Sequence, residues 1–265
     1  MKKFFMSALV AAAAFAAGAG EDYDLDKISA WRPVKGVTQQ GESLIVNGRA
    51  LLESKQAFDI RPDKVYKLEM EARNLNNAKS LVYFGFRLYA KNGKTPIWPH
   101  NVTTVNGTMT SVVKDVKKGD TVVYLKDVSK WQKVSNSYLA INAKADFSDL
   151  PNFRCYYFPM KSVEKVAEGY KVTLTKPFAV NIAKGTAVRQ HQTAGYMYAG
   201  GYKHLTSGKF VKMSGKVAET LKGPGFAHRS WSKYASKATV VILANWNGTG
   251  SVELKDIELE IDDKK

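Results

Sequence analysis

Cysteine is almost absent from this chain of 265 residues, which contains only Cys155. A disulfide needs two thiols and a four-cysteine zinc or iron–sulfur site needs four, so a single chain can form neither. The eight prolines and 20 glycines follow no collagen-like repeat, and apolar residues make up 45% of the chain. The composition is that of a globular protein, and the length allows one large β-domain or two domains of ordinary size.

Motifs that identify common enzymes are also missing. The sequence has no Gly-x-Ser-x-Gly element, no phosphate-binding loop and no dinucleotide fingerprint, and its four histidines share no zinc-binding spacing. Paired carboxylates for glycoside hydrolysis leave no sequence pattern, because the fold sets their separation. No motif names a reaction, so the sequence favours a binding protein over an enzyme.

Arginine is scarce among the positive charges. Lys and Arg number 40 against 24 Asp and Glu, a formal net charge of +16, and only eight of the 40 are Arg. Nucleic-acid readers rely on Arg for bidentate contacts, whereas Lys acts as a hydrated point charge. The composition predicts attraction to polyanions such as sulfated or uronic polysaccharides, anionic envelope or acidic lipid headgroups, and no nucleic-acid partner. Solvated strand faces are the alternative explanation of these lysines.

The first 19 residues have the three parts of a bacterial-type secretory signal peptide. Lys2 and Lys3 precede an apolar run over Phe4–Ala17, and Ala17-Gly18-Ala19 supplies small residues for cleavage. Removing the two lysines gives a mature charge of +14. No later apolar run approaches the roughly 18 residues of a membrane span, so we expect a secreted or periplasmic protein without a transmembrane segment.

Alternation with a period of two dominates the mature sequence. Within Val65–Ala72 and Leu81–Tyr89 the even-numbered positions are apolar, which is typical of strands with one buried face. Helical periodicity is scarcely visible after the signal peptide, so we predict an all-β protein. Further strands are predicted over Phe210–Val217, Ala238–Trp246 and Ser251–Ile261.

The middle of the chain has a different pattern. It contains a Gly-Asp-Thr strand start at 119–121, Asp127-x-Ser followed by Trp131, and a closing Gly-Thr-x-Val strand at 185–188. Over residues 108–190 this order resembles a small β-module found in exported bacterial and phage surface proteins. The resemblance implies a compact β-insertion, which we place at residues 108–195, and it assigns no catalytic residue.

The flanking regions resemble galactose-binding-like β-sandwiches, which include many carbohydrate-binding modules. The resemblance rests on the order of the strands Tyr66–Arg73, Leu81–Tyr89 and Phe210–Val217 and the closing strand Val252–Leu259, which contains Asp256. It implies a jelly-roll sandwich, which needs about eight strands, so residues 20–107 and 196–265 must combine across the insertion. Such sandwiches often hold a structural calcium, and the resemblance implies Asp24 and Asp256 as ligands. A solvated acidic tail also explains Asp24 and its acidic neighbours, and no other cofactor is required.

Aromatic and cationic residues on strand faces and loops are the candidate ligand contacts. Tyr83, Arg87 and Tyr89 alternate away from the core face of their strand, where a flat ring can stack on a sugar and a cation can pair with its sulfate or carboxylate. Burial beneath the insertion or beneath long loops is the alternative. Further candidates, which can equally cap the core, are Trp98 and, in the loop over 222–234, His228, Arg229, Trp231 and Tyr234.

Arg189 and His191, followed by Tyr196, Tyr198 and Tyr202, form another cluster. These are the residue types that a polysaccharide lyase uses to neutralise a uronate and move its proton. The same residues can attach the insertion to the sandwich.

The leading hypothesis is non-catalytic binding of an anionic polysaccharide. The alternatives are a basic envelope or matrix protein without a defined glycan site, and a polysaccharide lyase. The sequence makes no prediction of the oligomeric state.

Overall fold

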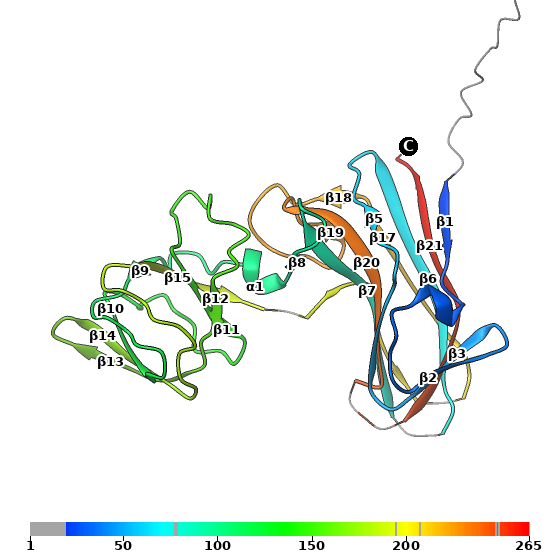
Figure 1. Ribbon diagram of the computed structural model, residues 1–265, viewed down its shortest axis with the longest axis horizontal. Helices are drawn as coiled ribbons and strands as arrows, with labels where there is room; N and C mark the ends of the chain where they lie inside the picture. The colour runs from blue at the N-terminus through cyan, green and yellow to red at the C-terminus, as the bar shows by residue number, and fades with distance from the viewer. Residues whose placement is uncertain are drawn as a thin grey trace, which may run out of the picture.

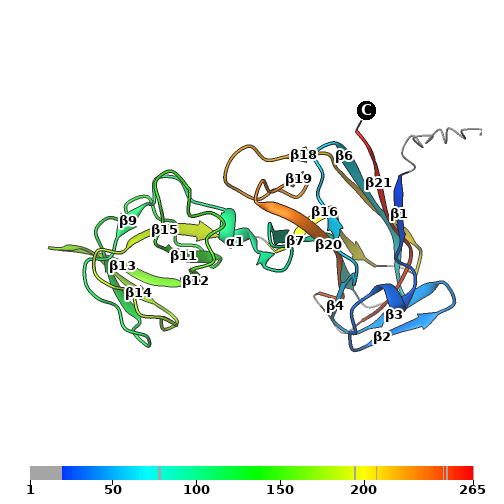
Figure 2. The same ribbon diagram turned by 45° about the horizontal axis from the view of Figure 1, so that its top comes forward.

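Strands in antiparallel sheets make up nearly all of the regular structure, which confirms the predicted all-β class. The computed structural model describes residues 20–76, 79–193, 195–206, 208–246, 248 and 250–264. The predicted signal peptide, residues 1–19, lies outside them. Figures 1 and 2 show two groups of sheets with the short helix α1 (Pro99–Val102) between them.

The first sheet of the larger group has the strand order β17-β6-β21-β3-β2, with β1 paired to β21. Its long central pair, β6 and β21, joins the two regions that flank the middle of the chain. The short 3-10 helix η1 (Ile28–Ala30) follows β1. The strands are β1 (Glu21–Asp24), β2 (Val37–Gln40), β3 (Ser43–Asn47), β6 (Lys64–Asn74), β17 (Val211–Val217) and β21 (Ser251–Asp263).

The second sheet has the order β16-β7-β20-β4, with β5 on β20 and β8 on β7. It also combines strands from both flanking regions. A separate parallel pair, β18 and β19, precedes β20 in the sequence. The strands are β4 (Ala50–Glu53), β5 (Phe58–Asp59), β7 (Ser80–Ala90), β8 (Pro96–Ile97), β16 (Met197–Leu205), β18 (Glu219–Thr220), β19 (Ser230–Trp231) and β20 (Ala235–Ala244).

One apolar core lies between these two sheets. The even-numbered residues of β7, such as Phe84 and Phe86, pack against Leu68 and Met70 of β6, as the period-two pattern predicted. The two sheets with one shared core confirm the β-sandwich expected from the resemblance to galactose-binding-like domains.

The middle of the chain forms two smaller sheets around a separate core. One has the order β10-β14-β13 and the other β12-β11-β15-β9, and Val123, Leu139, Phe158 and Val172 are buried between them. The boundaries at 108 and 195 stay a prediction. The strands are β9 (Thr110–Ser111), β10 (Val122–Leu125), β11 (Ser137–Ile141), β12 (Cys155–Tyr157), β13 (Met160–Val166), β14 (Gly169–Leu174) and β15 (Ala187–Gln192).

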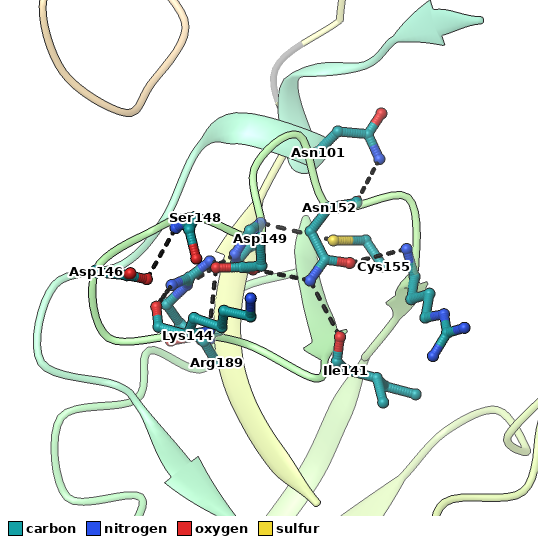
Figure 3. A network of polar contacts seen from close by, with 12 residues as sticks. Asn101, Ile141, Lys144, Asp146, Ser148, Asp149, Asn152, Cys155 and Arg189 are labelled. Carbon is teal, nitrogen blue, oxygen red and sulfur yellow. Dashed lines mark hydrogen bonds and ion pairs between the residues drawn. The ribbon is translucent and has the colours of Figure 1, made fainter. Parts of the chain in front are cut away.

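Hydrogen bonds fix α1 to the smaller sheets. The Asn101 side chain donates to the carbonyl of Asn152 at 2.9 Å, and the backbone N–H of Asn152 donates to the carbonyl of Asn101 at 2.8 Å (Figure 3). Behind them, Arg189 and Asp149 form an ion pair at 2.8 Å, with side chains 3% and 6% exposed. Because both charges are paired and hydrogen-bonded, the free-energy cost of burying them is offset. The segment to which α1 is hydrogen-bonded is therefore held in place.

Strand β16 closes one side of the sandwich by touching the backbone of both sheets. Its pairing with β7 passes from Met197–Phe86 to Gly201–Phe84, so residues 198–200 bulge opposite Gly85. A Cβ on Gly85 would overlap the carbonyl oxygen of Met197, and a Cβ on Gly215 in β17 would overlap that of Ala199. Only glycine fits at either position.

Gly215→Ala should therefore destabilise the sandwich. The added methyl has no space between two backbones, so we expect a loss of at least about 2 kcal/mol in the free energy of unfolding, measured by chemical denaturation. Gly223→Ala is the control, because no heavy atom lies within 4 Å of a Cβ there. Equal stability of the two variants would contradict the close approach of β16 and β17.

Candidate functional site

Aromatic rings form a row on the side of the second sheet that faces away from the core. Tyr83 of β7 packs against Tyr198 and Tyr202 of β16, with ring centroids 4.5 and 5.6 Å apart. Tyr202 is opposite Tyr83 in the strand register and is 60% exposed. Register partners project from the same side of a sheet, so Tyr83 and Tyr202 lie on the outer side together; Tyr202 presents its ring to solvent, whereas Tyr83 and Tyr198 are half-buried.

The row continues toward α1. Tyr196 lies 6.3 Å from Tyr198 and 5.3 Å from Trp98, which precedes α1. The Arg87 guanidinium lies 4.9 Å from the Trp98 ring and 5.3 Å from the Tyr196 ring, and donates to the Tyr196 hydroxyl at 3.2 Å. These cation–π contacts fix both rings. We call the set Tyr83, Trp98, Tyr196, Tyr198, Tyr202 and His228 the aromatic face.

A buried carboxylate holds Arg87 in place. The side chain of Glu53, at the end of β4, is 7% exposed and pairs with Arg87 and, at 3.2 Å, with Arg32. It also accepts hydrogen bonds from the hydroxyls of Tyr89 and, at 3.1 Å, Thr239. Two cations and two hydroxyls satisfy the carboxylate, which offsets the cost of its burial. Arg32 is 49% exposed and remains accessible beside the pair.

His228 joins the loop after β18 to the aromatic face. Its Nδ1 accepts the backbone N–H of Tyr198 at 3.1 Å, and its ring lies 5.7 Å from that of Tyr198 at an angle of 23°. This hydrogen bond needs an unprotonated Nδ1, and desolvation lowers the pKa of His228 accordingly. Burial raises the pKa of Tyr196 and Tyr198, so both phenols stay neutral.

The structure brings together four of the eight residues expected to contact a ligand: Tyr83, Arg87, Trp98 and His228. Their contacts link them through Tyr196 and Tyr198. Arg87 supports the rings from below, because its side chain is 17% exposed and faces Glu53. A role as a free cation for a sulfate group does not fit this position.

The other four candidates lie differently. Trp231 is 1% exposed and packs on Tyr66 and Phe86 in the core, so the expectation that it contacts a ligand is wrong. Tyr89 is 6% exposed and bonded to Glu53, which corrects its assignment to the solvent face. Tyr234 is partly buried against the core, and Arg229 is exposed.

Sequence reasoning missed the other partners of the face or placed them in a different site. Tyr196, Tyr198 and Tyr202 were grouped with His191, although the Tyr-x-Tyr spacing in a strand would have put 196 and 198 on one side. Glu53 and Arg32 gave no signal, because their importance comes from pairing across strands that are distant in sequence.

His191 does not have the access that a catalytic base needs. It has 0% exposed surface, donates from Nδ1 to the His100 carbonyl at 2.7 Å, and accepts at Nε2 from Arg189 at 3.0 Å. Burial, with the Arg189 charge nearby, lowers its pKa to about 4. A polysaccharide cannot reach this ring, which contradicts the alternative that placed a lyase base at His191.

The expected calcium ligands Asp24 and Asp256 each have a partner within the chain. Asp24 accepts the backbone N–H of Asp26 at 2.9 Å, and Asp256 pairs with Lys255 at 2.8 Å. Among the described residues, no group of three or more His, Cys, Asp or Glu side chains is placed to hold a metal ion. The calcium that the resemblance implies, with Asp24 and Asp256 as ligands, stays a prediction.

A cavity of about 560 Å³ lies away from the aromatic face, at the edge near β1 and β5. Core side chains such as Phe58 and Leu259 line it, together with the acidic Glu21, Asp22 and Asp24. Carboxylates repel anionic ligands, so this cavity does not suit the partners that the net charge predicts.

In the described part of the chain, no helix is long and apolar enough to cross a membrane.

Comparison with known proteins gives fold-level neighbours. No family model and no curated protein matches the chain. It is similar to the CBM22-1 xylan-binding domain of Paenibacillus barcinonensis Xyn10C (10% identity, TM-score 0.37, 94% of this chain and 100% of that one). It is also similar to the Emp47p carbohydrate recognition domain (10%, 0.31, 91% and 94%) and a Bauhinia forficata lectin in complex with GalNAc (9%, 0.33, 93% and 100%). With TM-scores below 0.5, these likenesses add nothing to the geometry above.

Glu53→Ala should destabilise the protein strongly. It leaves Arg87, 17% exposed, without its buried partner, so we expect a loss of about 3 kcal/mol or more in the free energy of unfolding by urea denaturation. Glu69→Ala, which breaks an ion pair with Lys212 whose side chains are 48% and 59% exposed, should change stability little. Similar losses in both variants would show that Glu53 has no special role.

Stability should also fall in mild acid. Burial lowers the pKa values of His100 and His191 to about 4, whereas unfolding returns them to about 6.5. Between these values the unfolded chain binds protons that the folded chain does not, so the free energy of unfolding falls as pH decreases, by at most about 3 kcal/mol per histidine. Urea denaturation at pH 7, 6 and 5 measures this slope, which His191→Gln should reduce. A flat profile would contradict the neutral buried ring.

Proposed function

We propose that this protein binds carbohydrate without catalysis, through the aromatic face, and that its ligand is an anionic polysaccharide. The observation that carries the proposal is the row of rings from Trp98 to Tyr202 on the outer side of a sheet. An open row suits an extended chain, along which successive sugar units can stack their apolar C–H faces on successive rings.

The support beneath the rings favours recognition of a shaped ligand. Glu53 and Arg87 hold Trp98 and Tyr196, and His228 holds Tyr198. Rings that are ordered before binding lose little side-chain freedom when a sugar arrives. The same contacts occupy the carboxylate, which lies beneath the face and pairs with two arginines, so it supports binding and not acid–base chemistry.

Charge supports an acidic ligand. The net charge is +16, and Arg32, 49% exposed, offers a guanidinium on the same Glu53 carboxylate that pairs with Arg87. A sulfate or carboxylate on the sugar can accept from this planar fork. Contacts of this kind weaken with salt, whereas ring stacking does not, so a bound anionic glycan should resist physiological salt in part.

Binding to immobilised heparin, polygalacturonate and neutral dextran, at low and physiological salt, tests the proposal. We expect retention on an anionic glycan that persists at physiological salt. Tyr202→Ala should weaken it about ten-fold, the equivalent of about 1.4 kcal/mol, because the exposed ring is lost while the fold is kept. Tyr124→Ala is the control, since it removes a tyrosine ring from β10, outside the aromatic face.

Three results would contradict the proposal. Retention that salt abolishes uniformly, without an effect of Tyr202→Ala, would favour the basic structural protein. New absorbance from unsaturated uronate products would show a lyase. No retention on any glycan would exclude both the anionic ligand and the aromatic face as its site.

A further inference from the structure

The sheet β12-β11-β15-β9 carries a second group of rings on its outer side, of which Tyr157 is exposed and Tyr138 is partly buried. Tyr138 of β11 and Tyr157 of β12 are register partners, with ring centroids 5.6 Å apart. Their neighbours Leu139 and Phe158 point into the core of this part, so both tyrosines project from the opposite side. Tyr157 is 42% exposed.

A cation accompanies these rings. The Nζ of Lys176 lies 5.5 Å from the Tyr157 ring centroid, and Lys176 is in none of the ion pairs found among the described residues. Residues 108–195 contain fourteen Lys and Arg against seven Asp and Glu, a net charge of +7. An exposed ring beside an available ammonium group matches the stacking surface and acidic group of a charged sugar.

Helix α1 connects this group to the aromatic face. The His100 ring stacks on Tyr138, with centroids 4.1 Å apart and planes 1° from parallel. Trp98, at the end of the aromatic face, is only two residues earlier, with Pro99 between them. The two sets of rings therefore meet at the start of α1. The hydrogen bonds from Asn101 to Asn152 keep that helix on the smaller sheets.

We propose that His100, Tyr138, Tyr157 and Lys176 form a second carbohydrate-contacting surface, the module surface, and that one anionic polysaccharide chain contacts it and the aromatic face together. This inference rests on the proposed function of the aromatic face. It assigns the module surface to the acidic groups of a longer chain, because this part carries a net charge of +7.

Two linked contacts make binding depend on ligand length. Once one segment of a chain is bound, the next segment reaches the second surface at a high effective concentration, so a long chain binds far more tightly than a short one. A tetrasaccharide is too short for this gain and reports on the stronger surface alone.

Isothermal titration with heparin and polygalacturonate, each as the polymer and as its tetrasaccharide, tests the inference. We expect Tyr157→Ala, and separately Lys176→Ala, to weaken polymer binding about ten-fold and tetrasaccharide binding less than about two-fold. Tyr202→Ala should weaken both. Tyr124→Ala, with its cation at 4.1 Å on another sheet, should weaken neither.

The outcomes separate the two proposals. A polymer affinity unchanged by Tyr157→Ala and Lys176→Ala, with the Tyr202→Ala loss intact, overturns the module surface and leaves the aromatic face. Loss with Tyr157→Ala but not Tyr202→Ala overturns the aromatic face, and with it the proposal that one chain contacts both surfaces, and leaves the module surface as a binding site by itself. Equal losses with Tyr124→Ala and Tyr157→Ala overturn the module surface, because they show that the loss is not specific to the rings of that surface. Thermal melting of each variant confirms that it is folded.

Discussion

The rest of the structure depends on the backbone of β16 lying against Gly85 and Gly215. These two glycines belong to different sheets, so β16 is fixed between them and closes that side of the sandwich. The bulge that results keeps Met197 in the core and leaves Tyr198 to pack on Tyr83. A single steric constraint thus closes the core and assembles the middle of the aromatic face, which couples the stability of the fold to the shape of its surface.

The buried charge of Glu53 fixes the part of the aromatic face that lies nearest α1. Removing Glu53 from water is costly, and the structure offsets that cost with two arginines and two hydroxyls. The arrangement does more than neutralise a charge, since Arg87 lies against the rings of Trp98 and Tyr196. An apolar residue at 53 could fill the same space but could not orient Arg87. The ion pair therefore serves the geometry of the surface more than the stability of the core.

Local pattern predicted the strands well and the site only in part. The alternation in Leu81–Tyr89 identified β7 and placed Tyr83 on its outer side, because side-chain direction in a strand follows from a period of two. No local sequence pattern predicts the bulge in β16, since the bulge depends on backbone packing against Gly85. Trp231 looked like a loop aromatic but fills the core, where its neighbours come from distant strands. Pairing across the sheet also brought Glu53 to Arg87, which no local spacing encodes.

Electrostatic attraction and ring stacking act over different distances, and this protein has both a net positive charge and ordered rings. At physiological ionic strength, charges are screened beyond about 8 Å, so under the proposed function the net charge of +16 would draw a polyanion near without selecting a register. Stacking acts only on contact, and in the proposed function the rings from Tyr202 to Trp98 would impose that register. Because His100 follows Trp98 by two residues and stacks on Tyr138, the same ring contacts lead directly onto the sheet beside α1. A chain guided by charge would thus meet ordered rings on both sides of one short helix.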